Sequence, residues 1–270
     1  DNDSQNVNIV FDGKEIVGTR ARKERAKSFN AFSSLNYPYP AVIQDGMIIR
    51  YLPEIDATDE VIERAVAVDA DMLITHHPLL FSPLKKITDE HFIGSRVVKL
   101  LQHDISYYAM HTNYDVCGMA DISAAILGLD GAETLEVTDE ESQEGIGRVG
   151  ELTCPMSLQS CGEFIKEKFQ LDSVKVFGDL SSTVQRIAIC PGSGKGMTEL
   201  ALEKNADVLV TGDIGHHEGI DAVAQGLAIV DAGHYGLEHI FIEDMANYLR
   251  KNVEGIVVET HEITHPFQVI

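Results

Sequence analysis

The chain has 270 residues, 44% of them hydrophobic and 24% charged, a composition ordinary for a globular protein with one large domain or two closely packed lobes. Its 43 acidic and 21 basic residues give a formal net charge of −22, which repels phosphate backbones and anionic membranes and argues against a nucleic-acid partner. No apolar run is long enough to span a membrane, and the four cysteines form no C-x-x-C pair, so we expect reduced thiols and a cytoplasmic protein.

Residues 1–50 show no clear hydrophobic periodicity. They contain a basic segment, Arg20-Ala-Arg-Lys-Glu-Arg-Ala-Lys27, and a Tyr/Pro-rich stretch, Tyr37-Pro-Tyr-Pro40. Prolines spaced so closely favour a turn over a regular element. We therefore expect a partly irregular N-terminal segment.

Residues 51–130 are expected to form a first α/β lobe. Thr58 is a good helix N-cap and apolar residues follow it at helical spacing, so a helix over 59–68 is predicted. The short apolar run Asp71-Met-Leu-Ile-Thr75 predicts a buried strand that ends at His76-His77-Pro78. Histidines therefore follow the carboxyl end of this strand.

The same order recurs further along the first lobe. A helix over 93–102 and a strand over 105–110 are predicted, and the strand ends at His111-Thr-Asn-Tyr-Asp115. Strands that alternate with helices indicate an α/β fold.

Residues 131–270 are expected to form a second α/β lobe, whose C-terminal part packs back on the first. Asn205-Ala-Asp-Val-Leu-Val-Thr211 lines up with Asp69-Ala-Asp-Met-Leu-Ile-Thr75, and each leads into a pair of histidines. Such likeness arises by chance in α/β proteins or reflects an internal duplication. A duplication predicts two similar lobes that face each other, with a ligand site between them. The acidic stretch 136–144 is expected to be a solvated loop linking them.

Histidines and acids gather at the predicted strand ends, where ligands bind in open α/β sheets. Imidazole and carboxylate suit divalent ions such as Zn²⁺, Mn²⁺, Fe²⁺ or Co²⁺, and a carboxylate can bridge two of them. A single histidine is more often a hydrogen-bonded core or turn residue, but seven of the eleven lie near four strand ends. In addition, Glu238 stands four residues after His234, so both can face one ion if a helix begins near Tyr235.

Four ordered segments resemble the family of GTP cyclohydrolase 1 type 2 homologues. They are Thr75-His-His-Pro-Leu-Leu-Phe81, His111-Thr-Asn-Tyr-Asp115, Thr211-Gly-Asp213 with His216-His217, and Ala232-Gly-His-Tyr-Gly-Leu-Glu238. The resemblance runs from about Asp56 to the C-terminus. It implies two-lobed α/β subunits, a toroidal homohexamer and a dinuclear metal site. The ligands it implies are His76, His77, Asp115, His234 and Glu238.

The resemblance also implies that His111, His216 and His217 are not direct ligands. Neighbouring residues orient metal ligands, so supporting roles are expected for these histidines, and His111 is the candidate for proton transfer. The N-terminus departs from the family, which has a Trp-Asp-Asn-x-Gly-Leu segment there. This chain has no Trp and offers only Asp1-Asn2.

A glycine-rich turn, Pro191-Gly-Ser-Gly-Lys-Gly196, lies between a predicted strand over 186–190 and a helix that begins near Met197. It is not a Walker A loop, because Ile189 and Gly196 stand where that pattern needs Gly and Ser or Thr. Gly194 and Lys195 are candidates for holding a substrate phosphate. The alternative is a tight turn that needs glycine for its backbone.

We expect a metal-dependent hydrolase that acts on a nucleotide or a related small molecule. Two bridged divalent ions, of Zn, Mn, Fe, Co or Ni, would lower the pKa of a shared water toward neutrality. The alternative is a non-catalytic protein that binds or delivers metal, or regulates, through its partners.

Overall fold

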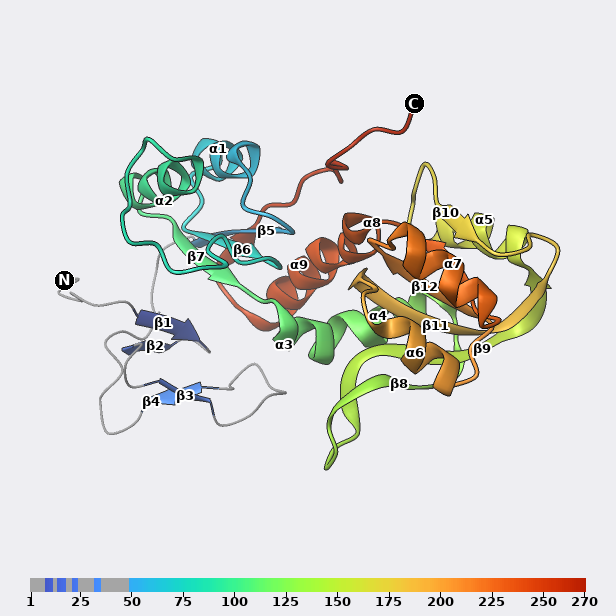
Figure 1. The fold of residues 1–270 in the computed structure, drawn as a ribbon. Coiled ribbons are helices and arrows are strands. Elements are labelled where there is room, and N and C mark those ends of the chain that lie inside the picture. The colour runs from blue at the N-terminus through green and yellow to red at the C-terminus, as the bar shows by residue number, and fades with distance from the viewer. Residues whose placement is uncertain (1–7, 12–13, 18–20, 24–31, 35–48) are drawn as a thin grey trace.

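The computed structural model describes residues 8–11, 14–17, 21–23, 32–34 and 49–270 (Figure 1). In the N-terminal segment it describes two antiparallel pairs of short strands: β1 (Asn8–Phe11) with β2 (Lys14–Val17), and β3 (Ala21–Lys23) with β4 (Phe32–Ser34). The Tyr/Pro-rich stretch 37–40 and most of the basic segment lie outside the described residues. The rest of the described chain forms two sheets with helices, which confirms the α/β class.

The first sheet has four strands, all parallel, in the order β14-β5-β6-β7. Helices α1 and α2 connect β5 to β6 and β6 to β7. The elements are β5 (Ile49–Glu54), α1 (Asp59–Ala67), β6 (Met72–Thr75), α2 (Phe92–Gln102), β7 (Ser106–Ala109) and β14 (Ile256–Val258). The predicted helices over 59–68 and 93–102 and the two strands are confirmed. Thr58 caps α1 as expected, because its hydroxyl accepts from the Val61 amide at 3.2 Å.

The second sheet has six strands in the order β10-β13-β12-β11-β9-β8. Its central strands β11, β12 and β13 are parallel and the outer pairings are antiparallel. The strands are β8 (Asp130–Asp139), β9 (Glu144–Ser157), β10 (Lys175–Phe177), β11 (Thr183–Ser193), β12 (Val208–Gly212) and β13 (Ala228–Asp231). The helices between them are α5 (Leu158–Lys168), α6 (Met197–Glu203) and α7 (His216–Ala224). The predicted strand over 186–190 and the helix beginning at Met197 are confirmed.

The acidic stretch 136–144 differs from its prediction as a linking loop. Strand β8 runs to Asp139, β9 begins at Glu144, and only the tip between them is a turn. Its acidic residues are tolerated in a strand because β8 is the edge of the sheet, where one side of the strand faces solvent. The stretch is therefore the end of a hairpin and does not link the two sheets.

The chain passes between the sheets twice. After β7 it runs through α3 (Thr112–Tyr114), a π-helical turn (Asp115–Met119) and α4 (Ala120–Leu127) to β8. After β13 it returns through α8 (His234–Glu238) and α9 (Ile240–Asn252) to β14. In Figure 1, α9 lies between the two sheets. The boundary predicted at residues 130 and 131 falls where β8 begins, and the division into lobes there remains a prediction.

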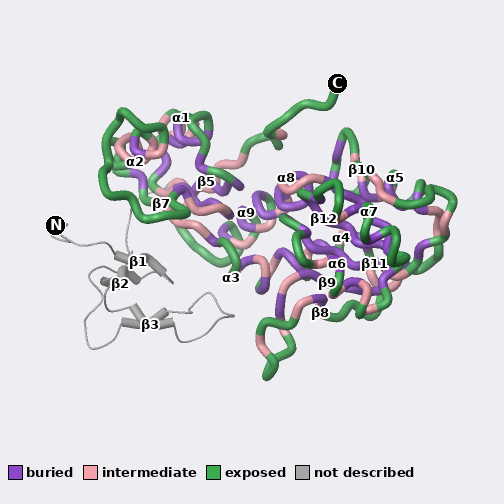
Figure 2. Tube along the Cα trace, viewed as in Figure 1, coloured by how far each residue is buried: buried purple, intermediate pink, exposed green. Residues whose placement is uncertain are grey.

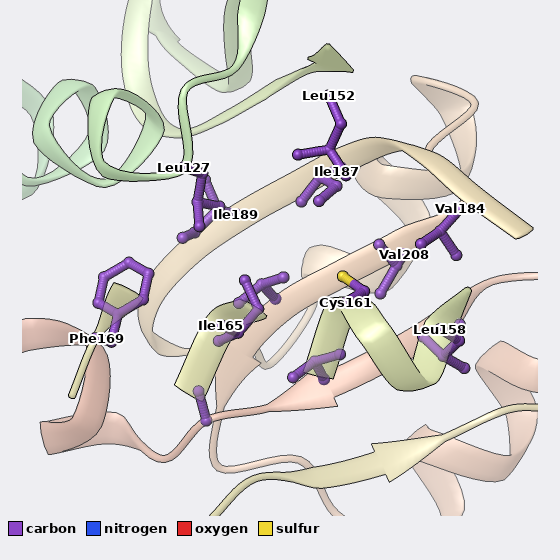
Figure 3. Packing of buried hydrophobic residues seen from close by; sticks show 14 of the residues in the cluster. Leu127, Leu152, Leu158, Cys161, Ile165, Phe169, Val184, Ile187, Ile189 and Val208 are labelled. Atoms are coloured by element: carbon purple, nitrogen blue, oxygen red, sulfur yellow. The ribbon is translucent and has the colours of Figure 1, made fainter. Parts of the chain in front are cut away.

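Helices cover both faces of the second sheet. On one face Phe169, Leu158 and Ile165 pack against strand residues such as Ile187 and Val208 (Figure 3). The opposite face, reached by the alternate strand residues, packs against α6 and α7. Strands β12 and β13 are buried along their whole length, and Figure 2 shows purple tube beside the β12 label. Each fully buried aliphatic side chain contributes about 1.5–3 kcal/mol.

The first sheet is covered by α1 and α2 on one face and by α9 on the other. Its edge strand β7 is more open, since Ser106 is exposed and the other residues are half-buried. Among the described residues, no helix is both long and apolar enough to cross a membrane.

Candidate metal centre

The turn after β6 carries His76 and His77, and side-chain hydrogen bonds fix its shape. The Tyr107 hydroxyl, from β7, donates to the His77 carbonyl and accepts from the Leu79 amide, both at 2.8 Å. The Thr75 hydroxyl donates to the same carbonyl at 2.6 Å. Both histidines therefore leave the sheet in a defined direction.

The five residues predicted as ligands converge around the carboxylate of Glu238. The Nε2 atom of His76 lies 3.4 Å from Glu238 Oε1 and 3.4 Å from Asp115 Oδ1. The Nε2 atoms of His77 and His234 lie 3.1 and 3.2 Å from Glu238 Oε2. These two nitrogens are only 3.2 Å apart. The structure thus brings residues from both sheets together at one point.

The Nδ1 atom of each of these imidazoles faces away from the cluster and has its own partner. His76 Nδ1 donates to the Met110 carbonyl at 2.9 Å. His77 Nδ1 donates to Asp56 at 2.9 Å, and His234 Nδ1 donates to Asp213 at 2.7 Å. Such partners fix the ring orientation of metal-binding histidines and leave Nε2 for an ion.

The arrangement fits a pair of divalent ions. Two groups of possible ligand atoms, each within 4.8 Å, share Glu238: one holds His76 and Asp115, the other His77 and His234. The buried atom His76 Nε2 makes no hydrogen bond, and the buried Glu238 Oε2 lies 3.1 and 3.2 Å from two imidazole nitrogens without the geometry of a hydrogen bond. Buried polar atoms are rarely left unpaired, so these two atoms indicate a missing ligand. Nitrogen and oxygen donors of this kind suit first-row divalent ions.

The electrostatics of the cluster indicate competition between protons and cations. Burial raises the pKa of Glu238, but the facing imidazoles outweigh it and hold that pKa well below its usual range. Burial lowers the pKa of His77, but Asp56 and Glu238 outweigh it and raise the pKa to about 10. Glu238 raises the pKa of His234 to about 9, and burial raises that of Asp115 to about 6. Protons and divalent ions would therefore compete for the same side chains.

His111 lies at the edge of the cluster and is exposed. Its ring centroid is 5.4 Å from that of His76 and 5.6 Å from that of His77. Burial and these two imidazoles lower the pKa of His111, which keeps it neutral at neutral pH. A potential ligand atom of His111 lies within 4.8 Å of those of His76 and His77, so its position suits a proton acceptor or a further ligand.

Three other histidines near the strand ends do not take part in the cluster around Glu238. His216 and His217 are exposed on the first turn of α7, and no metal-binding group among the described residues includes them. His239 is buried, and its Nε2 donates to the Phe169 carbonyl at 2.8 Å. The supporting role expected for His216 and His217 belongs instead to Asp56 and Asp213. These acids follow the carboxyl ends of β5 and β12, a placement that the strand-end rule would have identified.

The glycine-rich stretch begins inside the end of β11, which runs to Ser193, and contacts the cluster through Gly192. A Cβ atom there would lie 2.4 Å from Glu238 Oε1, and the residue has a positive φ of 82°. Gly194 packs behind Thr211 and its amide donates to the Gly212 carbonyl at 2.9 Å, while Lys195 is exposed. Glycine is required here for close approach to the site. A phosphate contact by Gly194 and Lys195 remains a prediction.

A cleft of about 740 Å³ opens beside the cluster. His77, His234 and the two acids that orient them lie on its wall, together with Lys175, Tyr235 and Phe267. Its volume is in the range of sites for small molecules. The cluster is therefore accessible to a ligand of that size.

The sequence is similar to those of several known proteins. Residues 49–266 match the family model described as Duf34/NIF3 (NGG1p interacting factor 3). A Lactococcus lactis protein named GTP cyclohydrolase 1 type 2 homolog is 36% identical over 226 residues, which cover 82% of this chain and 85% of the relative. A relative of the same name from Clostridium perfringens is 32% identical over 227 residues, with 83% and 87% covered.

Solved structures show the same fold. A Staphylococcus aureus hypothetical protein is 30% identical with a TM-score of 0.74, over 82% of this chain and 87% of that one. A Bacillus cereus protein related to NIF3 has a TM-score of 0.78 at 24% identity, over 84% and 92%. On the extent of the family match and the identity to these relatives, the chain belongs to the Duf34/NIF3 family.

Proposed function

We propose that this protein binds two divalent metal ions between its sheets and uses them to hydrolyse a nucleotide or a related small molecule. One observation carries the proposal. The carboxylate of Glu238 is 3% exposed and faces the Nε2 atoms of three histidines from both sheets. A buried carboxylate shared by two ligand groups is the arrangement that a bridged pair of ions requires.

The residues divide between the two ions. His76 and Asp115 would hold one, His77 and His234 would hold the other, and Glu238 would bridge them. Asp56 and Asp213 keep two of the imidazoles in orientation. When bound, such a pair of ions supplies Lewis acidity and lowers the pKa of a water.

His111 is the proposed proton acceptor. It sits against His76 and His77, and its lowered pKa leaves the imidazole free to take a proton at neutral pH. We expect His111→Gln to lower kcat about 100-fold or more while the metal content stays unchanged. Loss of metal from this variant would instead make His111 a ligand.

The name of the relatives makes a guanine nucleotide the first substrate to test. A second function, delivery of metal to a partner, is favoured by one observation: the His234 side chain is 33% exposed, so an ion there can reach solvent. The cleft beside His77 and His234 favours the enzyme. Metal that exchanges within seconds, with no turnover of any nucleotide, would support delivery.

Two further proposals concern architecture and assembly. An internal duplication is supported by the shared order of two units, β5-α1-β6-α2-β7 and β11-α6-β12-α7-β13, each with three parallel strands. A toroidal homohexamer in the cytoplasm follows from the resemblance to the GTP cyclohydrolase 1 type 2 homologues. Light scattering at micromolar concentration tests the assembly, and a monomeric mass would contradict it.

The function itself is tested by metal analysis of protein purified without chelator, followed by a hydrolase screen. Two ions per chain and turnover of a nucleotide are expected. Protein that takes up no divalent ion would overturn the dinuclear site. Two ions without hydrolysis of any nucleotide or phosphoester would overturn the enzymatic part alone.

A further inference from the structure

The cleft beside the candidate metal centre contains a single lysine or arginine among its lining residues, Lys175. Apart from the imidazoles of His77 and His234, the other ionisable groups of the lining are acidic, in a chain of net charge −22. Lys195, the lysine of the glycine turn, does not line this cleft. The Lys175 ammonium group therefore marks the place on this wall where an anionic part of a ligand would bind.

The fold holds Lys175 in a defined position. It lies on the edge strand β10, directly opposite Asp231 in the antiparallel pairing with β13. Its Nζ donates to Asp231 Oδ2 at 2.7 Å and to the Ile214 carbonyl at 3.2 Å. An ammonium group has three protons, and 57% of this side chain is exposed. Two of the three N–H groups are thus used to position the ammonium group, and the third is available to a ligand in the cleft.

Asp231 does not depend on Lys175 for its hydrogen bonds. It is 8% exposed and accepts from the amides of Ile214 at 3.2 Å and Gly233 at 3.1 Å. The Asp231 carboxylate therefore positions both the Lys175 ammonium group and the turn that leads into His234, so the distance between Lys175 and this turn is fixed.

The cleft also has an apolar, aromatic part. Tyr235 and Phe267 line it, and the Phe267 ring is 60% exposed. Exposed aromatic rings in a cleft offer a surface for a planar ring to stack on. The wall thus combines a cation, aromatic surface and the His77 and His234 side of the metal centre.

We propose that Lys175 binds the phosphate of an organic phosphate whose planar ring packs on Phe267 and Tyr235. This deepens the proposed function and rests on it, because the metal centre would act on the part of the molecule that lies against His77 and His234. Lysine binds phosphate as a point charge, and the contact requires no rearrangement of the sheet. Lys175 thus takes the phosphate-binding role for which the sequence suggested Lys195.

Calorimetric titration of the metal-loaded protein with GMP and guanosine tests the contact, since the two probes differ only by the phosphate. Wild type is expected to bind GMP about tenfold or more tightly than guanosine, the size of a hydrogen bond to a charged group. Lys175→Gln should remove most of that difference and Lys175→Arg should keep it. Lys204→Gln is the matched control, because Lys204 is also paired with an acid, Glu133, at 3.1 Å but lies outside the cleft.

Two results would overturn the proposal: a wild type that does not prefer GMP, or a Lys175→Gln variant that keeps the full preference. Elemental analysis of the same samples shows whether the phosphate contact or the metal centre is wrong. Two ions without a GMP preference refute the phosphate contact alone. A preference that depends on Lys175 in protein without ions would support the contact and contradict the dinuclear site.

Discussion

The two sheets supply residues to one centre by different means. In the first sheet, the turn after β6 is shaped by side chains, since Tyr107 and Thr75 hydrogen-bond its backbone. In the second sheet, the strand ends are brought together by close backbone packing at Gly192 and Gly212. The two sheets have similar connectivity, but the second sheet contributes the tightly packed side of the centre and the first sheet the side that depends on individual hydrogen bonds. The side from the first sheet should tolerate substitution better.

Gly212→Ala should have the largest effect, because it disturbs the packed side. A Cβ atom there would lie 2.4 Å from the His234 amide nitrogen and 2.8 Å from the Gly192 carbonyl oxygen. These are backbone atoms, so we expect a loss of about 3 kcal/mol in the free energy of unfolding, together with weaker metal binding. Gly162→Ala in α5 is the control, because its nearest neighbour would lie 3.5 Å away. Denaturant unfolding measures both, and equal effects would refute the packing argument.

Tyr107→Phe removes the hydroxyl that shapes the other side. The His77 carbonyl would keep its bond from Thr75, but the Leu79 amide would lose its partner. We expect a cost of about 1–3 kcal/mol in the free energy of unfolding, the penalty for a partly buried unpaired group. Thermal unfolding with and without metal measures it. A fully stable variant would show that the turn does not need this side chain.

The acids that orient the imidazoles allow a matched comparison. Asp56→Asn and Asp213→Asn each keep the size of the side chain and remove its charge, and Asn tolerates the positive φ of 59° at position 213. Each should weaken metal binding about 10- to 100-fold, as measured by competition with a chelating dye. Unchanged affinity in both would mean that Asp56 and Asp213 do not orient ligands.

The stability of the metal-free protein should also depend on pH. The pKa values of His77 and His234 are raised to about 10 and about 9, so their contribution to stability is present below the unfolded value of about 6.5. It is lost as pH rises through the two folded-state values. The Tm of chelator-treated protein should therefore fall between neutral pH and pH 10, and metal binding should release protons. A Tm that rises over this interval would contradict the assignment.

Much of the fold was predictable because its signals are local. Helices α1 and α2 and strand β6 followed from caps, apolar spacing and a short apolar run. The hairpin formed by residues 136–144 was predicted wrongly, since acidic composition does not reveal an edge strand that needs only one buried face.

The site was predictable to the extent that it obeys the strand-end rule. His76, His77 and Asp115 follow strands β6 and β7, so their convergence follows from a parallel sheet. The roles of Asp56 and Lys175 were not predicted. The first depends on which way the His77 ring turns, and the second on an antiparallel edge strand that pairs out of chain order.

Glu238→Gln tests the central claim most directly, because this carboxylate lies at the contact between the two sides. Gln keeps the size and removes the charge that two cations require. Elemental analysis of wild type should give two divalent ions per chain, and the variant should lose at least one. Glu243→Gln, an exposed acid on the adjoining helix, is the control and should keep both. Equal metal content in wild type and Glu238→Gln, with His234→Ala also unchanged, would contradict the dinuclear centre.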